Sequence, residues 1–228
     1  MKQLPLPIGS AAAPSFDNFI VGSNALALAE IECLVPGAAP LYLWGPAGCG
    51  KTHLLRALAD RVAAAGVVVS RFDADDAGDD ASAATCCDEA TGLVVLDDCD
   101  RYDAAQQHRA FAAFVFAATH GVAVAAAGRL PPVDLPLRDD LRSRLGSGPV
   151  FALQPLAEPQ MRAALRREAD RRGLFLPEEL VSYLLTRFER DLGHLMAQLE
   201  RLDRYALVAK RALTLPLLRQ MLAEEATS

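Results

Sequence analysis

The stretch LYLWGPAGCGKTHLLRAL, residues 41–58, constrains the possible fold more than any other part of the chain. Leu41–Trp44 is a short apolar run typical of a buried parallel strand, and the residues after the turn have the apolar spacing of a helix that ends at Gly66. The turn has the spacing Gly-x4-Gly-Lys-Thr and consists of Gly45, Pro46, Ala47, Gly48, Cys49, Gly50, Lys51 and Thr52. A strand, a glycine-punctuated turn and a helix in this order predict a phosphate-binding P-loop.

The residue types of this turn indicate what it is suited to hold. Glycines let backbone N–H groups converge on phosphate oxygens, and the start of the helix adds partial positive charge. We expect Lys51 to reach the β- and γ-phosphates and the Thr52 hydroxyl to bind Mg²⁺. His53 belongs to the same motif, with packing or capping beside the loop as its main role. The expected cofactors are therefore ADP or ATP with Mg²⁺, against the alternative of a chance Gly-Lys-Thr turn.

A second apolar run ends in acidic residues, in the segment GLVVLDDCD, residues 92–100. In P-loop proteins the first acid after such a strand holds Mg²⁺, usually through water. This predicts that Asp97 is a metal partner and that Asp98 orients or activates the attacking water. An ordinary solvated strand end is the alternative.

The rest of the chain predicts an α/β domain followed by a helical one. Residues 121–125 resemble another core strand, followed by a loop at 128–132, and strands alternate with helices as far as residue 152. This alternation indicates a parallel sheet covered on both faces. Beyond Pro155 there are four helical patterns with little strand signal. We expect an extended tail over 1–14, an α/β nucleotide-binding domain over 15–153 and a helical domain over 154–228.

Charge and composition argue against several other classes of protein. The net charge is −6, and residues 151–228 carry 12 basic and 11 acidic side chains, which leaves −7 on residues 1–150. Because duplex binding depends on phosphate neutralisation, we expect no direct specific DNA binding. The acidic segment 73–92 also lacks the basic and aromatic residues that single-stranded DNA requires. We expect no membrane span, and the five cysteines, with no zinc-type spacing, indicate reduced thiols and a cytoplasmic location.

Five segments together resemble the ATPase core of the DnaA family of bacterial replication initiators: FDNFIVGSN (16–24), YLWGPAGCGKTHLL, LVVLDDCD, LPP and LRSRLGSG (141–148). The likeness extends over residues 15–225. It implies an AAA+ P-loop NTPase core with a parallel sheet, and a small C-terminal all-α lid domain. It also adds Val21 to the nucleotide-binding residues. Since the printed chain ends at Ser228, we expect the initiators' helix-turn-helix domain to be absent.

The N-terminal peptide QLPLP resembles the sliding-clamp-binding peptide of the Hda group, the DnaA-related regulators that inactivate initiation. Its residues are Gln3, Leu4, Pro5, Leu6 and Pro7. The Gln3 amide would form hydrogen bonds, the two leucines would fill apolar clefts, and the prolines would lower the entropy lost on ordering. An apolar tail by chance is the alternative. The resemblance implies two partners, the DNA polymerase sliding clamp and the initiator DnaA.

The same resemblance places an arginine finger at Arg144, in a position to reach a neighbouring subunit's nucleotide; a surface arginine is the alternative. Two positions depart from the initiator pattern. Where initiators have a polar sensor before Arg-Pro-Pro, this chain has Ala126-Ala127-Gly128-Arg129-Leu130. In the lid, Gly193 occupies the position of the initiators' sensor arginine. The nearest substitute is Arg190, about one helical turn away.

We therefore expect a nucleotide-bound adaptor, holding mainly ADP, that docks on the clamp and stimulates ATP hydrolysis by the initiator. An autonomous AAA+ ATPase that loads or remodels a replication protein is the main alternative. A nucleic-acid-binding initiator paralogue is a third. Whether the chain is itself an effective enzyme and whether it forms a homo-oligomer are left open by the sequence.

Overall fold

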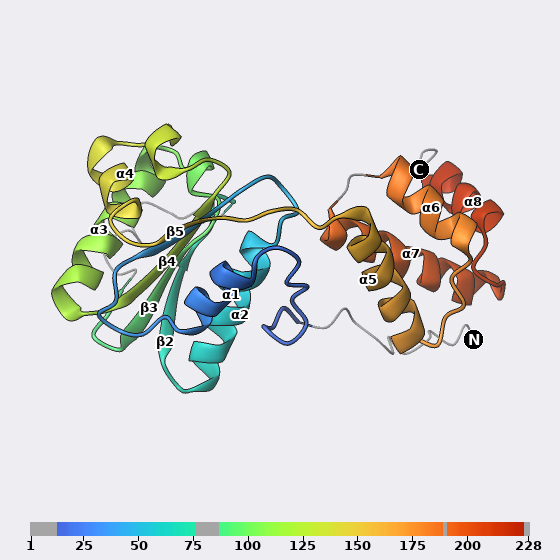
Figure 1. Ribbon diagram of the computed structural model, residues 1–228, viewed down its shortest axis with the longest axis horizontal. Helices are drawn as coiled ribbons and strands as arrows, with labels where there is room; N and C mark the ends of the chain where they lie inside the picture. The colour runs from blue at the N-terminus through green and yellow to red at the C-terminus, as the bar shows by residue number, and fades with distance from the viewer. Residues whose placement is uncertain (1–12, 76–86, 189–190, 226–228) are drawn as a thin grey trace, which may run out of the picture. The chain divides into compact units, whose positions relative to one another are not determined.

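The computed structural model describes residues 13–75, 87–188 and 191–225, and the chain divides into two compact units (Figure 1). The first unit is Pro14–Pro155 and the second begins at Leu156. The proposed clamp-binding peptide and Arg190 lie outside the described residues.

A five-stranded sheet forms the centre of the first unit, in the order β2-β3-β4-β1-β5, and all the described pairings are parallel. The strands are β1 (Leu41–Trp44), β2 (Val68–Phe72), β3 (Thr91–Leu96), β4 (Ala123–Gly128) and β5 (Val150–Ala152). The helices of this unit are α1 (Ala25–Glu32), α2 (Lys51–Ala64), α3 (Ala104–His120) and α4 (Asp139–Leu145), with short 3-10 turns η2 (Cys99–Arg101) and η3 (Pro132–Asp134).

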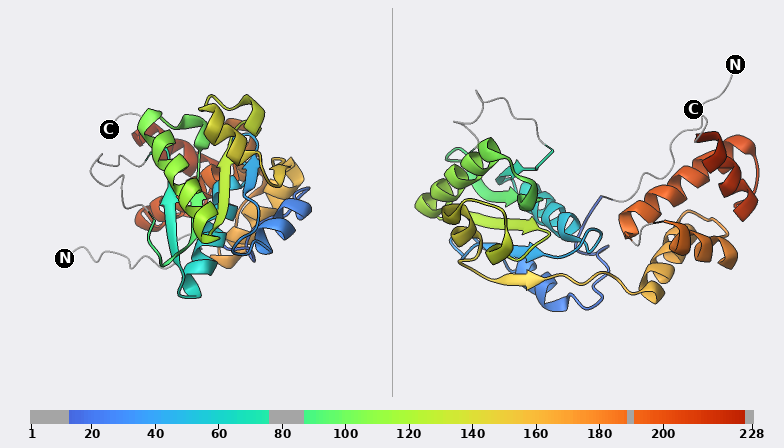
Figure 2. Two further views of the ribbon diagram at one scale, coloured as in Figure 1. Left: turned by 90° about the vertical axis from the view of Figure 1, so that its left-hand side faces the viewer. Right: turned by 90° about the horizontal axis from the view of Figure 1, so that it is seen from above.

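Helices cover both faces of this sheet, as Figures 1 and 2 show. Alternate side chains of each strand belong to different cores, because successive residues of a strand point to opposite faces. Leu41 and Leu43 pack with α1 and α2 on one face. Tyr42 packs with α3 and α4 on the other. Burial on both faces explains why the strands read as continuous apolar runs, and it confirms the predicted parallel sheet with helices on both sides.

The carboxyl ends of three neighbouring strands form the edge where the candidate site lies. β4 lies between β1 and β3, so the P-loop after β1 and the acidic pair after β3 stand on either side of the end of β4. The Gly45 N–H donates a hydrogen bond to the Gly128 carbonyl at 3.3 Å, which ties the start of the P-loop to that end.

The strand that the sequence places at 121–125 lies later, at Ala123–Gly128. Gly121 adopts a left-handed conformation (φ 66°) that ends α3, and the Val122 N–H still donates to the Ala117 carbonyl. Glycine adopts this conformation without the steric cost of a side chain, which is why it commonly follows a helix. The chain therefore completes the helix before it enters the sheet, and Gly128 belongs to the strand rather than to the following loop.

The second unit consists of four helices, α5 (Glu158–Arg171), α6 (Glu178–Arg187), α7 (Leu192–Ala209) and α8 (Leu215–Glu225). Their apolar faces meet in one core built mainly of leucines, including the fully buried Leu165, Leu184, Leu199 and Leu218. Asp191 caps the start of α7 by accepting hydrogen bonds from the Gly193 and His194 N–H groups. Within the described ranges, no helix is both long and apolar enough to cross a membrane.

Candidate functional site

The P-loop has a backbone that depends on its glycines. Gly45, Gly48 and Gly50 have φ values of 150°, 74° and 99°, in the region that side chains disfavour. A Cβ at Gly45 would lie 2.5 Å from the Leu153 carbonyl oxygen, and one at Gly50 would lie 2.7 Å from the Phe19 ring. The loop is therefore pressed closely between its neighbours, with no room for side chains at these two positions.

Lys51 is buried at the start of α2, and its ammonium group is held by the loop itself. It donates hydrogen bonds to the carbonyls of Gly45 (2.9 Å) and Pro46 (3.0 Å). Its side chain also lies 3.8 Å from the Cys49 sulfur, and burial raises the pKa of that thiol. A lysine that is 6% exposed and bonded to backbone carbonyls is a cation held ready to bind phosphate oxygens.

Thr52 and Asp97 meet across the sheet edge. The Thr52 side chain is hydrogen-bonded to the Asp97 carboxylate, and Asp97 is 7% exposed. Burial raises the pKa of Asp97, and the hydrogen bond from Thr52 partly offsets that effect. A hydroxyl and a carboxylate side by side offer the hard oxygen ligands that Mg²⁺ prefers. Among the described residues no cluster of three metal-binding side chains exists, so phosphate and water oxygens would have to complete such a site.

Asp98, the second acid, has a neighbour that the sequence analysis missed. The Arg101 guanidinium lies 3.3 Å from the Asp98 carboxylate and also donates a hydrogen bond to Asp75 at 2.6 Å. Asp98 itself has a left-handed backbone (φ 49°), which is uncommon for a residue with a side chain. The carboxylate expected to activate water is thus paired with an arginine from the adjoining turn.

The end of β4, where initiators have a polar sensor, is filled by other side chains. A Cβ at Gly128 would collide with the Tyr42 hydroxyl and lie 3.1 Å from the Asp100 carboxylate. The Tyr42 hydroxyl donates to the Leu130 carbonyl at 2.9 Å, and Asp100 accepts a hydrogen bond from the Arg129 N–H at 2.7 Å. Burial raises the pKa of Tyr42, which is therefore a neutral donor.

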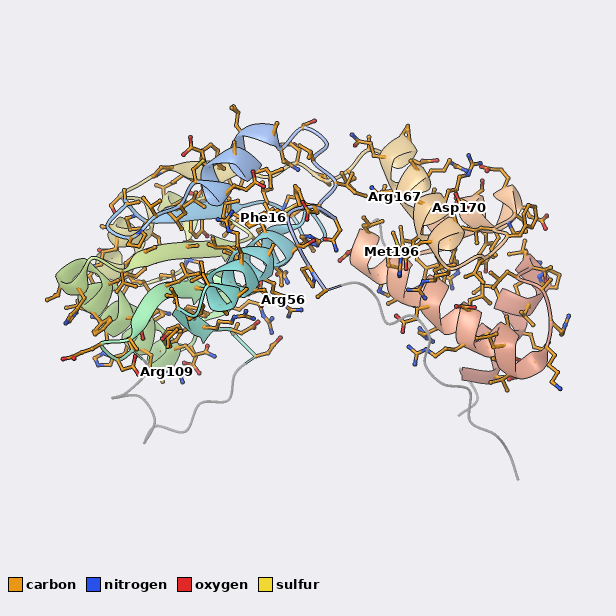
Figure 3. All side chains as sticks on the ribbon, turned by 90° about the horizontal axis from the view of Figure 1, so that it is seen from below. Phe16, Arg56, Arg109, Arg167, Asp170 and Met196 are labelled. Atoms are coloured by element: carbon orange, nitrogen blue, oxygen red, sulfur yellow. The ribbon has the colours of Figure 1, made fainter. Side chains whose placement is uncertain are left out.

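The FDNF segment packs on α2 next to the P-loop, and Figure 3 shows Phe16 beside that helix. The Arg61 guanidinium lies 4.6 Å from the centre of the Phe16 ring. The Phe19 ring lies 5.5 Å from the His53 ring, and His53 Nε2 is within hydrogen-bonding distance of the Ser15 carbonyl (2.9 Å). His53 is therefore occupied in holding this segment.

The residues after the FDNF segment are hydrogen-bonded to the last residues of the α/β unit. Val21 is half-buried, and its carbonyl accepts a hydrogen bond from the Asn24 N–H at 2.8 Å. The Asn24 side chain makes two hydrogen bonds with the backbone of Gln154, at 2.9 and 2.8 Å. These bonds join the start of the α/β unit to its end.

Arg144 lies in the last turn of α4, and its partners differ from those of the neighbouring arginines. Arg138 pairs with Asp140 at 2.6 Å, and Arg142 pairs with Asp139 at 2.5 Å. The half-buried Arg144 guanidinium lies 5.1 Å from the centre of the Phe111 ring. It makes no hydrogen bond or ion pair with another described side chain.

Two family models match the chain. The model of the bacterial DnaA ATPase domain matches residues 12–69, which include the P-loop, and the model of the Hda lid domain matches residues 158–222. The chain is an Hda-like, DnaA-related protein. This confirms the resemblance inferred from the sequence motifs.

Solved structures show that the fold of this DnaA-related chain is that of the AAA+ proteins. Domain III of the DnaA replication initiation protein from Thermotoga maritima is 22% identical, with a TM-score of 0.76, covering 97% of this chain and 98% of that one. AMPPCP-bound DnaA from Aquifex aeolicus is 22% identical, with a TM-score of 0.66 over 83% of this chain and 65% of that one. The RuvB Holliday junction branch migration motor of Thermotoga maritima is 16% identical, with a TM-score of 0.65 over 92% and 71%. The predicted fold is confirmed.

Proposed function

We propose that this chain is a nucleotide-bound adaptor that stimulates ATP hydrolysis by the initiator DnaA through Arg144, and so negatively regulates replication initiation. One observation carries the proposal: Arg144 is an arginine without a carboxylate partner among the described residues, in the LRSRLGSG segment whose resemblance to the initiators implies a finger. An arginine finger stabilises the charge that develops on a transferred phosphoryl group and contributes about 10³–10⁵ in rate.

The placement of α4 supports action on a neighbour's nucleotide rather than on the chain's own. α4 packs through Leu141 and Leu145 on one face of the sheet, whereas the P-loop helix α2 packs on the opposite face. Arg144 therefore belongs to a different surface of the unit from α2.

A bound nucleotide is supported by the P-loop geometry and by the relatives whose structures contain AMPPCP. The backbone of residues 45–50 and the Lys51 ammonium would hold the phosphates, and Thr52 with Asp97 would hold Mg²⁺, which neutralises phosphate charge. Val21 is assigned to the same pocket. We propose ADP as the main occupant, because no side chain stands at Gly128 to bind a γ-phosphate.

Weak intrinsic hydrolysis follows from the surroundings of the acidic pair. Arg101 pairs with Asp98, the residue expected to activate water, and Tyr42 and Asp100 fill the space beside Gly128. A general base that is paired with a guanidinium is less available to accept a proton. We therefore assign this unit to holding a nucleotide rather than to rapid turnover.

The sliding clamp is proposed as the second partner. Gln3, Leu4, Pro5, Leu6 and Pro7 form the peptide assigned to this contact, and they lie outside the described residues. Docking on a clamp would raise the adaptor's effective concentration near its target on DNA. The cytoplasm is the proposed location.

An autonomous ATPase that loads or remodels a replication protein is the second candidate. The complete P-loop and the Thr52–Asp97 contact favour it. Reconstitution separates the two: ATP-bound DnaA, DNA-loaded clamp and this protein are combined, and phosphate release is followed with each component omitted in turn. The adaptor requires fast release only in the complete mixture. Comparable release by this protein alone would establish the autonomous enzyme.

A further inference from the structure

One aromatic ring lies against two guanidinium groups on the α4 side of the sheet. The centre of the Phe111 ring is 5.5 Å from the Arg138 guanidinium and 5.1 Å from that of Arg144. Both distances are within the range of a cation–π contact, which is about 6 Å. The ring comes from α3. Arg138 directly precedes α4 and Arg144 lies within it, so the contact joins two helices.

The two guanidinium groups differ in how their charge is balanced. Arg138 is paired with Asp140 at 2.6 Å, and its N–H donates to Gln107 of α3 at 3.0 Å. The Arg144 guanidinium has the Phe111 ring as its contact, with no carboxylate among the described residues. A ring face attracts a cation without cancelling its charge. Arg144 is therefore held while it stays a full cation.

Phe111 is placed differently from the other phenylalanines of α3. Phe114 is 3% exposed within the core, and Phe116 packs against that core and stacks on His120 at 4.1 Å. Phe111 is half-buried and stands outside the core cluster of the described residues. Its ring is thus available to the guanidinium groups rather than committed to the sheet.

We propose that Phe111 is a positioning residue: its ring holds the Arg144 guanidinium in an orientation suited to bind a partner's phosphates. The inference rests on the proposed arginine-finger function. A carboxylate partner would orient an arginine equally well, but the ion pair would have to break before the guanidinium could bind another anion. A ring avoids that competition, and it also reduces the rotamer freedom that a long side chain loses on binding.

Three variants at two positions test the proposal in the reconstituted mixture of ATP-bound DnaA, loaded clamp and adaptor. Phe111→Leu keeps apolar volume without the ring face, Phe111→Tyr keeps the ring, and Phe116→Leu is the control on the same helix. We expect Phe111→Leu to lower the maximal stimulated rate by roughly three- to thirtyfold, the range that a cation–π contact supports. The concentration of adaptor giving half-maximal stimulation should change little. Phe111→Tyr should retain stimulation, and Phe116→Leu should leave it unchanged.

A second readout does not depend on activity. The Arg144 Nε–H resonance should shift in Phe111→Leu and not in Phe116→Leu, because a ring nearby alters the local magnetic field. No shift, or equal stimulation by the Leu and Tyr variants, overturns the positioning role. In an Arg144→Ala background, Phe111→Leu should have no further effect. If Arg144→Ala itself leaves stimulation intact, the finger function fails rather than the Phe111 contact that the resonance reports.

Discussion

At the scale of single residues, Gly128 has no room for a side chain. The Tyr42 hydroxyl and the Asp100 carboxylate occupy the volume that a side chain would need. Both are committed to backbone groups, the Leu130 carbonyl and the Arg129 N–H. The space beside Gly128, where the resemblance to the initiators leads us to expect a polar sensor, is therefore closed by packing.

Gly128→Ala should lower the free energy of unfolding by about 1–3 kcal/mol, since an added methyl group would overpack the site. Tyr42→Phe alone should cost about 1 kcal/mol through the lost hydrogen bond. Because the collision is with the hydroxyl, the double variant should be less destabilised than the sum of the two. Denaturant unfolding of all four proteins measures this coupling. Additive losses would show that Tyr42 does not fill the site.

Lys51→Ala should remove the stabilisation that a bound nucleotide provides. At about 100 times its Kd a ligand raises the free energy of unfolding by about 2.7 kcal/mol. The variant should lose most of this gain for ADP and ATP, because we propose that the ammonium group binds the phosphates of both. Arg56→Ala, on the exposed side of the same helix (Figure 3), is the control. Melting with and without nucleotide gives the answer, and an equal gain in both variants would exclude the P-loop as the site.

Residues of the site differ in how far the sequence could predict them. The P-loop residues are consecutive, so their spacing was enough to predict both the loop and its place after a strand. Other contacts near the site join distant positions; Asn24 and Gln154, which are bonded to each other, are 130 positions apart. Phe111 beside Arg144 and Tyr42 beside Gly128 depend on which strands and helices become neighbours. No local pattern in a single sequence contains that information.

At the scale of single elements, α5 carries the clearest dependence on pH. Glu168 accepts hydrogen bonds from Arg171 at 2.7 and 2.9 Å and from Arg172 at 2.5 Å. These bonds lower the pKa of Glu168 from 4.5 to about 2. A carboxylate whose folded pKa is lowered stabilises the fold above its unfolded pKa, and this contribution is lost as the pH falls through the folded value.

Glu168→Gln should therefore flatten the decline in unfolding free energy between about pH 4.5 and pH 2. Near pH 7 the variant should be less stable than the parent, and the two should converge in acid. Glu179→Gln on α6, an exposed glutamate, is the matched control. Denaturant titrations of the full chain across this range test the prediction. Parallel curves for Glu168→Gln and the parent would contradict it.

Elements were predicted well where one signal dominates. The helices α5 to α8 follow from apolar spacing, since each presents one face to a leucine core. The strand β4 was placed too early, because the apolar residues after α3 run continuously into the sheet. Only the left-handed turn at Gly121 separates helix from strand there, and composition alone does not reveal it.

At the scale of the whole molecule, the chain combines an AAA+ α/β unit, a helical lid unit and the N-terminal segment. Hydrophobic patterning predicted an α/β unit followed by a helical one, because each has its own core. The role assigned to the segment came from a short resemblance and stays a prediction.

Replacing Gln3, Leu4 and Leu6 together with alanine should abolish binding to the sliding clamp, because the amide and both apolar anchors are lost. Nucleotide affinity and melting temperature should stay within experimental error of the parent, since the changed residues precede the α/β unit that begins at Pro14. Surface plasmon resonance on immobilised clamp measures the first, and calorimetry measures the second. Undiminished clamp affinity would contradict the docking assignment.

The central claim is that Arg144 acts on the nucleotide of a neighbouring protein. The most direct measurement is phosphate release from ATP-bound DnaA in the presence of the DNA-loaded clamp and the Arg144→Ala variant of this protein. The Arg142→Ala variant, changed on the same helix, is measured beside it. We predict that Arg144→Ala loses stimulation by at least a hundredfold while ADP and clamp binding persist, and that Arg144→Lys restores little, because an ammonium group lacks the guanidinium fork. Arg142→Ala should stimulate normally. Full stimulation by Arg144→Ala would contradict the account.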